Sequence, residues 1–346
     1  MQPALPTAPV RPLPSVLTLD PTEEADWDAS LAGLPEATFF HTASWARVLK
    51  SAYGYRPLYL ATRQGSRLAS LLPLMGVASW LTGRRGVGLP FTDEVPPLAP
   101  DPSAFDALYQ EARRQADSRR WKYIELRGGA HFLPAAPASA TFRGHTLDLT
   151  RGEAALFAGF ESSTRRAVRK AEQNGLRIEF SQSLESVRDF HRLLVLTRRR
   201  HGVPPQPFSF FASVQRHALA TNNGWVVLAR HDDRPVAGAV YLHFGKAVLY
   251  KYGASDEAFQ HLRGNNLVMA EAIRRFAGQG FATLNFGRTD LANEGLRKFK
   301  LSWGTAEHPV SYFRHLLPSG IFLAATPPSS GRLARVFHFV PNPVSR

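Results

Sequence analysis

An internal repeat constrains the fold of this chain more than any other feature of its sequence. The segment LYLATRQGSRLASLLPL (58–74) aligns without a gap with residues 226–242 of WVVLARHDDRPVAGAVYL (225–242), 168 residues further on. Each copy has the pattern of a strand, a polar turn and a second strand, with turns at Gln64-Gly65-Ser66 and Asp232-Asp233. We therefore expect two β-hairpins in equivalent positions.

A second pair of segments repeats after the hairpins, at a spacing of 160 residues. FDALYQEARRQADSRR predicts an amphipathic helix that leads into WKYIELRGG, and NLVMAEAIRRFAGQG predicts one that leads into FATLNFGRTD. Two copies of one α/β fold explain this pattern better than one large domain. We divide the chain into a proline-rich tail (1–14), a first domain (15–150), a second domain (151–318) and a C-terminal tail (319–346).

The boundary at residue 150 follows from local signals. HTLDLT (145–150) alternates like a strand, and Arg151-Gly152 interrupts it. A helix is predicted from about Glu153, and another begins after Ser162-Ser163, with Ser163 or Thr164 as its cap, and ends at Asn174-Gly175. A third helix is predicted over 184–200, and its buried face would consist of Val187, Phe190, Leu194 and Val195.

Composition excludes several classes of protein and favours anionic partners. The chain of 346 residues has no cysteine, which excludes disulfides, thiolate catalysis and zinc fingers. Its net charge of +14 attracts nucleic acid, nucleotide phosphates or an anionic membrane surface. The longest uncharged apolar stretch (68–81) is too short and too interrupted to span a bilayer. We expect a cytoplasmic protein, with a peripheral position on the inner membrane face as the alternative.

The common catalytic motifs are missing from this sequence. It has no G-x-S-x-G elbow, no H-E-x-x-H, no Walker A loop and no kinase-like set of motifs. The 12 histidines are scattered, so we expect no metal site, and no Ser-His-Asp arrangement can be assigned from spacing. The reaction class that remains is group transfer, which depends on positioning of the substrates, on amide donors and on groups that bind phosphate.

Four stretches of the chain form a recognisable set: FFHTASWARVLKSAYGYRPLYLATRQGSRLASLLPLM with GRRGVGLPFTDEVPPL, LDLTRGEAALFAGFESSTRRAVRKAEQNGLRIEFSQS, RRRHGVPPQPFSFF, and LNFGRTDLANEGLRKFKLSWG. Together they resemble the FemAB-like branch of the GNAT superfamily, which includes BioF2-like (CelD-type) acyltransferases. The resemblance implies an α/β (α+β) chain of two tandem GNAT folds, each a mixed, mostly antiparallel sheet flanked by helices.

The same resemblance implies transfer of an acyl or aminoacyl group to an amine of a cell-envelope or glycan precursor, by direct attack on the donor. The acceptor would be a small molecule or a lipid- or nucleotide-linked glycan. The donor would be an acyl-CoA or an aminoacyl-tRNA, used as a co-substrate, with no tightly bound cofactor. The positive charge favours the tRNA donor, and the absence of sustained heptads, which build the coiled-coil arm of some tRNA-using relatives, favours acyl-CoA.

A loop before the second amphipathic helix is the candidate donor site. In GNAT enzymes a Q/R-x-x-G-x-G/A turn wraps the CoA pyrophosphate with amides at a helix N-terminus. The corresponding stretch here is 261–266, in which only Gly264 matches the motif fully, and Arg263, Gly264, Asn265 and Asn266 are the candidate donor-binding residues. The first position of the motif is His261, and the last is Asn266 where a small residue is usual. A plain helix-entry turn is the alternative.

Other candidate catalytic residues follow from the fourth stretch and from a strand. Lys300 matches the lysine of an F-K-x-x-[FW]-G motif, where it serves the donor phosphate or the developing oxyanion; a surface cation is the alternative. Arg288 and Asp290 follow a predicted strand and would orient substrate or close a turn as an ion pair. Tyr252 would relay a proton or stack on substrate. Alternation along the strand places it on the same face as Tyr250. Packing in the core is the alternative role for these tyrosines.

A basic helix is the candidate substrate-binding element. Arg165 and Arg169 are four residues apart, as are Arg166 and Lys170, so each pair shares a face. These cations would hold a nucleotide-sugar pyrophosphate, a tRNA backbone or a lipid head group, or form a solvated basic face. Two further readings stay open for the whole chain: a catalytically inactive tandem-GNAT scaffold, and a non-enzymatic nucleic-acid-binding protein.

Overall fold

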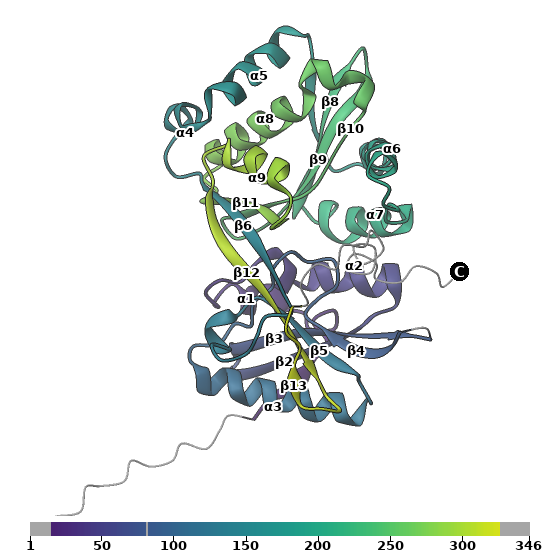
Figure 1. Cartoon of the computed structure of the whole chain (residues 1–346), viewed down its shortest axis with the longest axis vertical. Helices are drawn as coiled ribbons and strands as arrows, with labels where there is room; N and C mark the ends of the chain where they lie inside the picture. Colours follow the sequence, from purple (N-terminus) through teal and green to yellow (C-terminus); the bar gives the residue numbers. More distant parts are fainter. Residues whose placement is uncertain (1–14, 81, 326–346) are drawn as a thin grey trace, which may run out of the picture.

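The computed structural model describes residues 15–80 and 82–325. The predicted N-terminal tail (1–14) and most of the predicted C-terminal tail (319–346) lie outside the described residues. Figure 1 shows two halves stacked along the long axis of the molecule and connected by long strands.

The first half has the following elements: β1 (Leu17–Leu19), α1 (Trp27–Leu31), η1 (Phe39–His41), α2 (Ala43–Tyr53), β2 (Arg56–Gln64), β3 (Arg67–Ser79), β4 (Gly83–Val87), α3 (Pro102–Ser118), β5 (Tyr123–Arg127), η2 (Ala130–Phe132) and β6 (Ala140–Asp148).

The second half continues with α4 (Glu153–Gly159), α5 (Ser162–Gln173), β7 (Arg177–Ser181), α6 (Leu184–Arg200), α7 (Phe208–Val214), η3 (Gln215–Leu219), β8 (Gly224–His231), β9 (Arg234–Phe244), β10 (Ala247–Ser255), η4 (Glu257–Leu262), α8 (Gly264–Gly278), β11 (Thr283–Asp290), α9 (Glu294–Leu301), β12 (Ala306–Leu316) and β13 (Ile321–Phe322).

The repeat seen in the sequence is present in the fold. The hairpins β2–β3 and β8–β9 occupy equivalent places, and each half continues through a helix (α3 or α8) into a strand (β5 or β11). That strand pairs in parallel with β4 in the first half and with β10 in the second, whereas the other pairings are antiparallel. The predicted fold class, a tandem α/β arrangement of mixed, mostly antiparallel strands flanked by helices, is confirmed, although the strands described form one continuous sheet.

The two halves share one sheet because β6 and β12 cross between them (Figure 1). In the described residues the strand order is β1-β2-β3-β4-β5-β12-β6-β11-β10-β9-β8-β7, with β13 beside β12. β6 pairs with β11, and β12 pairs first with β6 and then with β5. The division at residue 150 stays a proposal, since strands on both sides of it pair across the halves.

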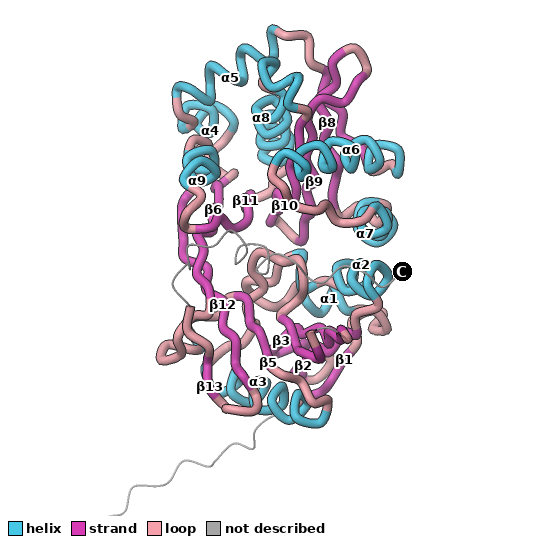
Figure 2. The backbone as a smooth tube through the Cα atoms, turned by 45° about the vertical axis from the view of Figure 1, so that its right-hand side comes forward, coloured by secondary structure: helices cyan, strands magenta, loops and turns pink. Residues whose placement is uncertain are grey.

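A common apolar core also joins the halves. Helices α2 and α7 lie side by side at their border (Figure 2), where the ring centroids of Trp45 and Phe210 are 6.1 Å apart. Both rings are fully buried in a cluster that includes residues of β2, β3, β8, β9 and β10. The opposite faces of the sheet are covered by α8 in the second half and by α3 in the first. This shared core fixes the relative position of the halves.

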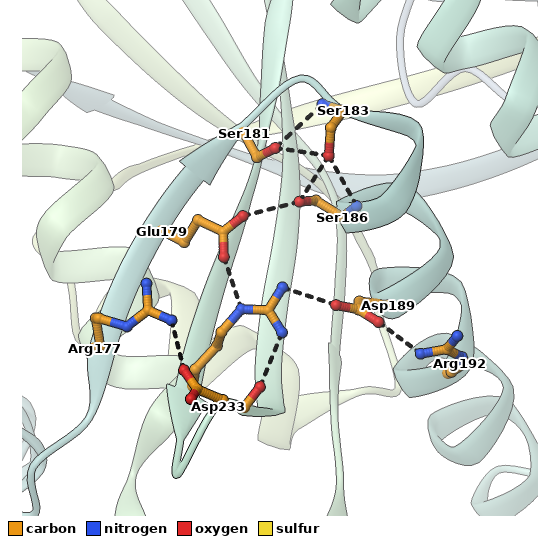
Figure 3. Close-up of polar contacts among 9 residues, drawn as sticks. Arg177, Glu179, Ser181, Ser183, Ser186, Asp189, Arg192 and Asp233 are labelled. Carbon is orange, nitrogen blue, oxygen red and sulfur yellow. Dashed lines mark hydrogen bonds and ion pairs between the residues drawn. The ribbon is translucent and has the colours of Figure 1, made fainter.

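Helix α6 has the predicted bounds, and a polar network attaches it to the edge of the sheet (Figure 3). Ser183 caps the helix by accepting from the Ser186 amide. Arg230 of β8 donates to Glu179 of β7 and to Asp189 of α6, at 2.7 Å in each case. Two carboxylates on one guanidinium fix the helix against β7 and β8. Val187, Phe190 and Leu194 are buried as predicted, but Leu193 takes the core position predicted for Val195.

Two local predictions are wrong. Helix α5 is capped by Glu161 without a side-chain hydrogen bond, and neither Ser163 nor Thr164 caps it, because the Thr164 hydroxyl donates to Ser302 instead. Tyr250 and Tyr252 do not share a face. A bulge in β10 shifts the register between them, so Tyr250 joins the core under α8 and Tyr252 joins the core shared by the halves.

Candidate functional site

A bulge in β11 opens the sheet at its centre. The register with β6 shifts between Asn285 and Arg288, and Gly287 has a φ of +69°. The Asn285 side chain accepts from the Gly287 amide at 2.6 Å, which stabilises the bulge. A β-carbon on Gly287 would lie 3.2 Å from a carboxylate oxygen of Asp93. Glycine is therefore required here both for the backbone conformation and for the close approach of the other half.

The neighbouring strand β10 diverges from β11 at the same level. The two strands pair in parallel only over Ala247–Leu249 and Thr283–Asn285, after which each contains its bulge. The bulge in β10 directs Lys251 toward the first half, where its ammonium reaches Asp93. Parallel strands that separate after a short paired stretch leave space between their C-terminal ends.

A cavity of about 240 Å³ lies between the two halves beside these bulges. Its walls come from the η1 segment and the loop after β4 on one side, and from β6, β10, β11 and β12 on the other. Glu94 and His308 line it and approach within 3.4 Å of each other across the halves. The cavity is therefore assembled by the whole chain, and neither half could form it alone.

Four charged side chains lie at this cavity or next to its lining residues, and we call them the charge cluster (Asp93, Lys251, Arg288 and Lys300). Asp93 and Arg288 line the cavity. The ammonium of Lys251 lies 2.9 Å from one oxygen of Asp93, and Nε of Arg288 lies 4.0 Å from the other. With Lys300 charged, the cluster carries three positive charges and one negative charge. This excess suits a ligand group or a transition state that carries negative charge.

The environment shifts the pKa values within the cluster. Burial would raise the pKa of Asp93, but the charges of Lys251 and Arg288 outweigh it and hold this pKa below its usual value. Burial lowers the pKa of Lys251, against the attraction of Asp93. Burial also lowers the pKa of Lys300 to about 8. Asp93 is therefore ionised at neutral pH, and Lys300 titrates closer to neutrality than an ordinary lysine.

Lys300 reaches the β11 bulge from helix α9. Only 3% of the residue is exposed, whereas Lys298 on the same helix is exposed, so the alternative of a surface cation is wrong for Lys300. Its ammonium donates to the carbonyl oxygens of Gly287 and Arg288, at 2.9 Å each. Lys300 thereby places a charge inside the opening that the bulge creates.

Aromatic rings and backbone contacts position Arg288 and Asp93. The Arg288 guanidinium lies 3.8 Å from the ring centre of Phe142 and 5.0 Å from that of Tyr312. The Tyr312 hydroxyl donates to the carbonyls of Thr92 and Asp93, at 3.2 and 2.7 Å. Arg127 also donates to Thr92, at 3.0 Å. The backbone that carries Asp93 is held from two sides, so its carboxylate is pre-organised.

The predicted donor loop lies at the N-terminus of α8. Arg263 adopts a left-handed conformation (φ 61°) and precedes the helix without a side-chain cap. In the part of the chain that the structure describes, the amides of Gly264 and Asn265 have no hydrogen-bond acceptor. Gly264 also packs on the sheet, because a β-carbon there would lie 2.9 Å from that of Ala237. Asn265 donates to Ser255 at 3.1 Å, and Asn266 closes the first turn onto Arg263.

The structure does not bring the other predicted residues into the cavity. Asp290 is exposed at the end of β11. Tyr252 is buried with its hydroxyl unpaired among the described residues, and its ring packs 5.2 Å from Phe211. It lies beside the cluster, since the Lys251 ammonium is 5.2 Å from its ring centre. Core packing is the role that its contacts show.

The basic helix α5 lies at the far end of the second half, away from the border between the halves, in both views (Figures 1 and 2). The Arg165 guanidinium donates to the carbonyls of Ala158 and Phe160, so it fixes the end of α4. Arg169 stacks over Phe157 at 5.9 Å. Arg166 and Lys170 are exposed and remain available for an anionic ligand.

Sequence reasoning missed Asp93 and Lys251 as functional candidates. Asp93 stands in the first of the four family-like stretches, and Lys251 stands between the two tyrosines, but they are 158 positions apart. No local pattern connects residues at such a distance. Within the described residues, no group of three or more histidine, aspartate or glutamate side chains is placed to hold a metal ion. None of the helices described is long and apolar enough to cross a membrane.

Comparison with known proteins agrees with this architecture. Residues 158–308 match the family model of the acetyltransferase (GNAT) domain. The crystal structure of FemX superposes with a TM-score of 0.72 at 16% identity, covering 88% of this chain and 98% of FemX. A tandem GNAT protein from the clavulanic acid biosynthesis pathway gives 0.55 at 13% identity, covering 88% and 98%. L-PGS from Bacillus licheniformis gives 0.55 at 13% identity, covering 90% and 93%. No curated protein matches the chain in sequence.

Proposed function

We propose that this protein is an N-acyltransferase. The proposal starts from the match of residues 158–308 to the GNAT acetyltransferase domain and from the likeness of the whole chain to the fold of FemX. The observation that carries the proposal is the charge cluster at the cavity between the halves. It combines one ionised carboxylate with an excess of positive charge, which are the two features that acyl transfer to an amine requires.

The cluster supports a direct attack of the amine on the donor carbonyl. The Asp93 carboxylate would accept a hydrogen bond from the amine and take up its proton as the C–N bond forms. The carbonyl π electrons would move to oxygen, and Arg288 and Lys300 would stabilise this charge. When the oxyanion collapses, the C–S bond of a CoA thioester or the C–O bond of a tRNA ester breaks, and the leaving group takes a proton. No covalent enzyme intermediate is needed.

The donor would be held at the N-terminus of α8. The unpaired amides of Gly264 and Asn265 and the positive end of a 15-residue helix suit a pyrophosphate. Arg263 would add a phosphate contact, and Asn265 and Asn266 would shape the turn. We propose an acyl-CoA as the first donor for this loop and an aminoacyl-tRNA as the second. Both are co-substrates of the cytoplasm, where we place the activity.

The acceptor would be an amine of a cell-envelope or glycan precursor. The sequence resemblance to FemAB-like transferases is what supports a nucleotide- or lipid-linked acceptor. Asp93 and Glu94 give the cavity the acidic groups that attract an amine. The exposed Arg166 and Lys170 of α5 would serve a larger anionic part of a substrate, such as a pyrophosphate or a tRNA backbone.

Thermal unfolding with acetyl-CoA and longer acyl-CoAs tests the donor. Donor at 100 times its Kd should stabilise the protein by roughly 2.7 kcal/mol. Arg263→Glu should lose this shift, and Arg200→Glu, an exposed arginine on α6, should keep it. If only aminoacyl-tRNA stabilised the protein, the donor would be aminoacyl-tRNA and not acyl-CoA. An inactive scaffold would give no shift and no acylated amine with either donor, and that result would overturn the proposal.

A further inference from the structure

One tryptophan protrudes at the outer end of the first half's sheet. Trp80 is 93% exposed, whereas the other exposed large apolar residues of the described chain range from 36% to 56%. Trp80 directly follows β3, and the pairing of Ser79 with Gly83 extends the β3–β4 hairpin to this point. Exposing a large aromatic ring to water costs free energy that burial would recover. This exposure therefore suggests that a binding partner covers the Trp80 ring.

Six cations lie at the same end of the sheet, and with the tryptophan we call them the Trp80 surface. Arg56 begins β2, Arg84 and Arg85 lie at the start of β4, and a second group lies between α3 and β5. The carbonyl of Arg84 accepts from the Lys122 amide at 2.9 Å, which places the two groups side by side. The surface consists of Trp80, Arg56, Arg84, Arg85, Arg119, Arg120 and Lys122.

These cations are not neutralised within the fold. Arg85 is half-buried and the other five are exposed. Within residues 15–80 and 82–325, no carboxylate lies within 4 Å of their charged groups. By contrast, buried or half-buried arginines elsewhere, such as Arg127 and Arg230, are paired with carboxylates. The positive charge of this end therefore remains available to an external anion.

We propose that the Trp80 surface docks on an anionic phospholipid bilayer. The indole would lie at the boundary between headgroups and acyl chains, and the surrounding cations would contact the lipid phosphates. A single aromatic ring at a protruding tip suits a bilayer surface. Single-stranded nucleic acid is usually bound along a groove with several stacking rings.

Strand β4 connects the Trp80 surface to the cavity. Its five residues span about 17 Å, and the loop that carries Asp93 follows its end. Docking would hold the cavity at a fixed distance from the bilayer. The proposal does not depend on the proposed acyl transfer, because it rests on exposure and charge at the opposite end of the strand.

Vesicle co-sedimentation of the full chain tests the proposal. The vesicles would contain phosphatidylglycerol and phosphatidylcholine in equal parts, with pure phosphatidylcholine for comparison. We expect at least tenfold stronger partitioning onto the anionic vesicles, with a steep loss at high salt. Trp80→Ser and the double variant Arg56→Ala/Arg84→Ala should each weaken it about tenfold or more, with unchanged melting temperatures.

Two matched controls distinguish docking through the Trp80 surface from nonspecific electrostatic or hydrophobic binding to vesicles. Arg199→Ala/Arg200→Ala removes two exposed charges from α6, and Leu291→Ser removes another exposed apolar side chain. Both should bind within twofold of the wild type. Doxyl-labelled lipids should quench wild-type fluorescence, and Trp80→Phe should remove most of that quenching. The proposal would be overturned if Trp80→Ser bound vesicles like the wild type, or if the α6 control lost as much vesicle binding as the Trp80 surface variants. It would also be overturned if Trp80 were needed to bind bulk tRNA and the protein did not bind vesicles.

Discussion

Lys251 of β10 and Asp93 of the loop after β4 form an ion pair of 2.9 Å that joins the two halves of the molecule at the cavity. The Lys251 side chain is only 5% exposed, so each charge depends on the other for compensation. Pairs of this kind cost several kcal/mol when one partner alone is removed. This contact therefore connects the stability of the interface between the halves with the chemistry proposed for the cavity.

Asp93→Asn should reduce acyl transfer at least a hundredfold and destabilise the chain by about 3 kcal/mol, because it removes the proton acceptor and leaves Lys251 unpaired. Transfer rates and urea unfolding would measure the two effects. Asp93→Asn/Lys251→Met should recover much of the stability without recovering the activity. Recovery of activity in the double variant would show that Asp93 acts only as the partner of Lys251.

Gly287→Ala should lower activity far more than its effect on stability suggests. The substitution strains a residue at φ +69° by about 1–2 kcal/mol, and its β-carbon presses on the Asp93 carboxylate. Gly245→Ala is the matched control, since Gly245 has φ +54° and open space around its β-carbon. Both variants should lose similar stability in chemical denaturation, but only Gly287→Ala should lose activity. Equal activities would argue against the bulge as part of the site.

Lys300 should make stability rise with pH. Its pKa falls from 10.5 in the unfolded chain to about 8 in the folded protein. Between these values the unfolded chain binds more protons, so the free energy of unfolding increases with pH, by up to roughly 3 kcal/mol. Unfolding measured from pH 7.5 to 10 should show this increase in the wild type and lose it in Lys300→Met. Lys298→Met, on the exposed side of α9, should keep it.

His41 should make the protein sensitive to acid. Its Nδ1 accepts from the Thr38 amide at 3.1 Å, and its Nε2 lies 2.9 Å from the carbonyl of Pro96, so only the neutral ring satisfies both contacts. Burial lowers its pKa from 6.5 to about 4.

The unfolded chain therefore binds the extra proton between pH 6.5 and 4, and stability should fall by up to roughly 3 kcal/mol as the pH decreases through this window. His41→Gln should remove only part of the slope in this window, because burial also lowers the pKa of His145 to about 4. The exposed His261→Gln should leave it unchanged. A wild-type slope in His41→Gln would assign the acid sensitivity to other groups.

Local patterns predicted the repeated hairpins and the bounds of α6, because alternation, helical periodicity and turn residues act over short distances. The tandem GNAT fold followed from the family resemblance and from the repeat. Lys300 was found through its motif, and Arg288 through its place at a strand end. Strict alternation misplaced Tyr250 relative to Tyr252, because a bulge leaves no mark in the sequence. The exchange of β6 and β12 between the halves, and the contact of Asp93 with Lys251, depend on tertiary packing that no local pattern encodes.

The most direct test of the central claim is mass spectrometry of amine acceptors incubated with the protein and each donor class. The acceptors would include amino sugars, nucleotide-linked precursors and aminophospholipids. We expect one acceptor to gain the mass of an acyl or aminoacyl group with wild type and with Asp106→Asn, an exposed aspartate on α3, and not with Asp93→Asn. Equal product from wild type and Asp93→Asn would contradict the assignment of the cavity between the halves as the site of transfer.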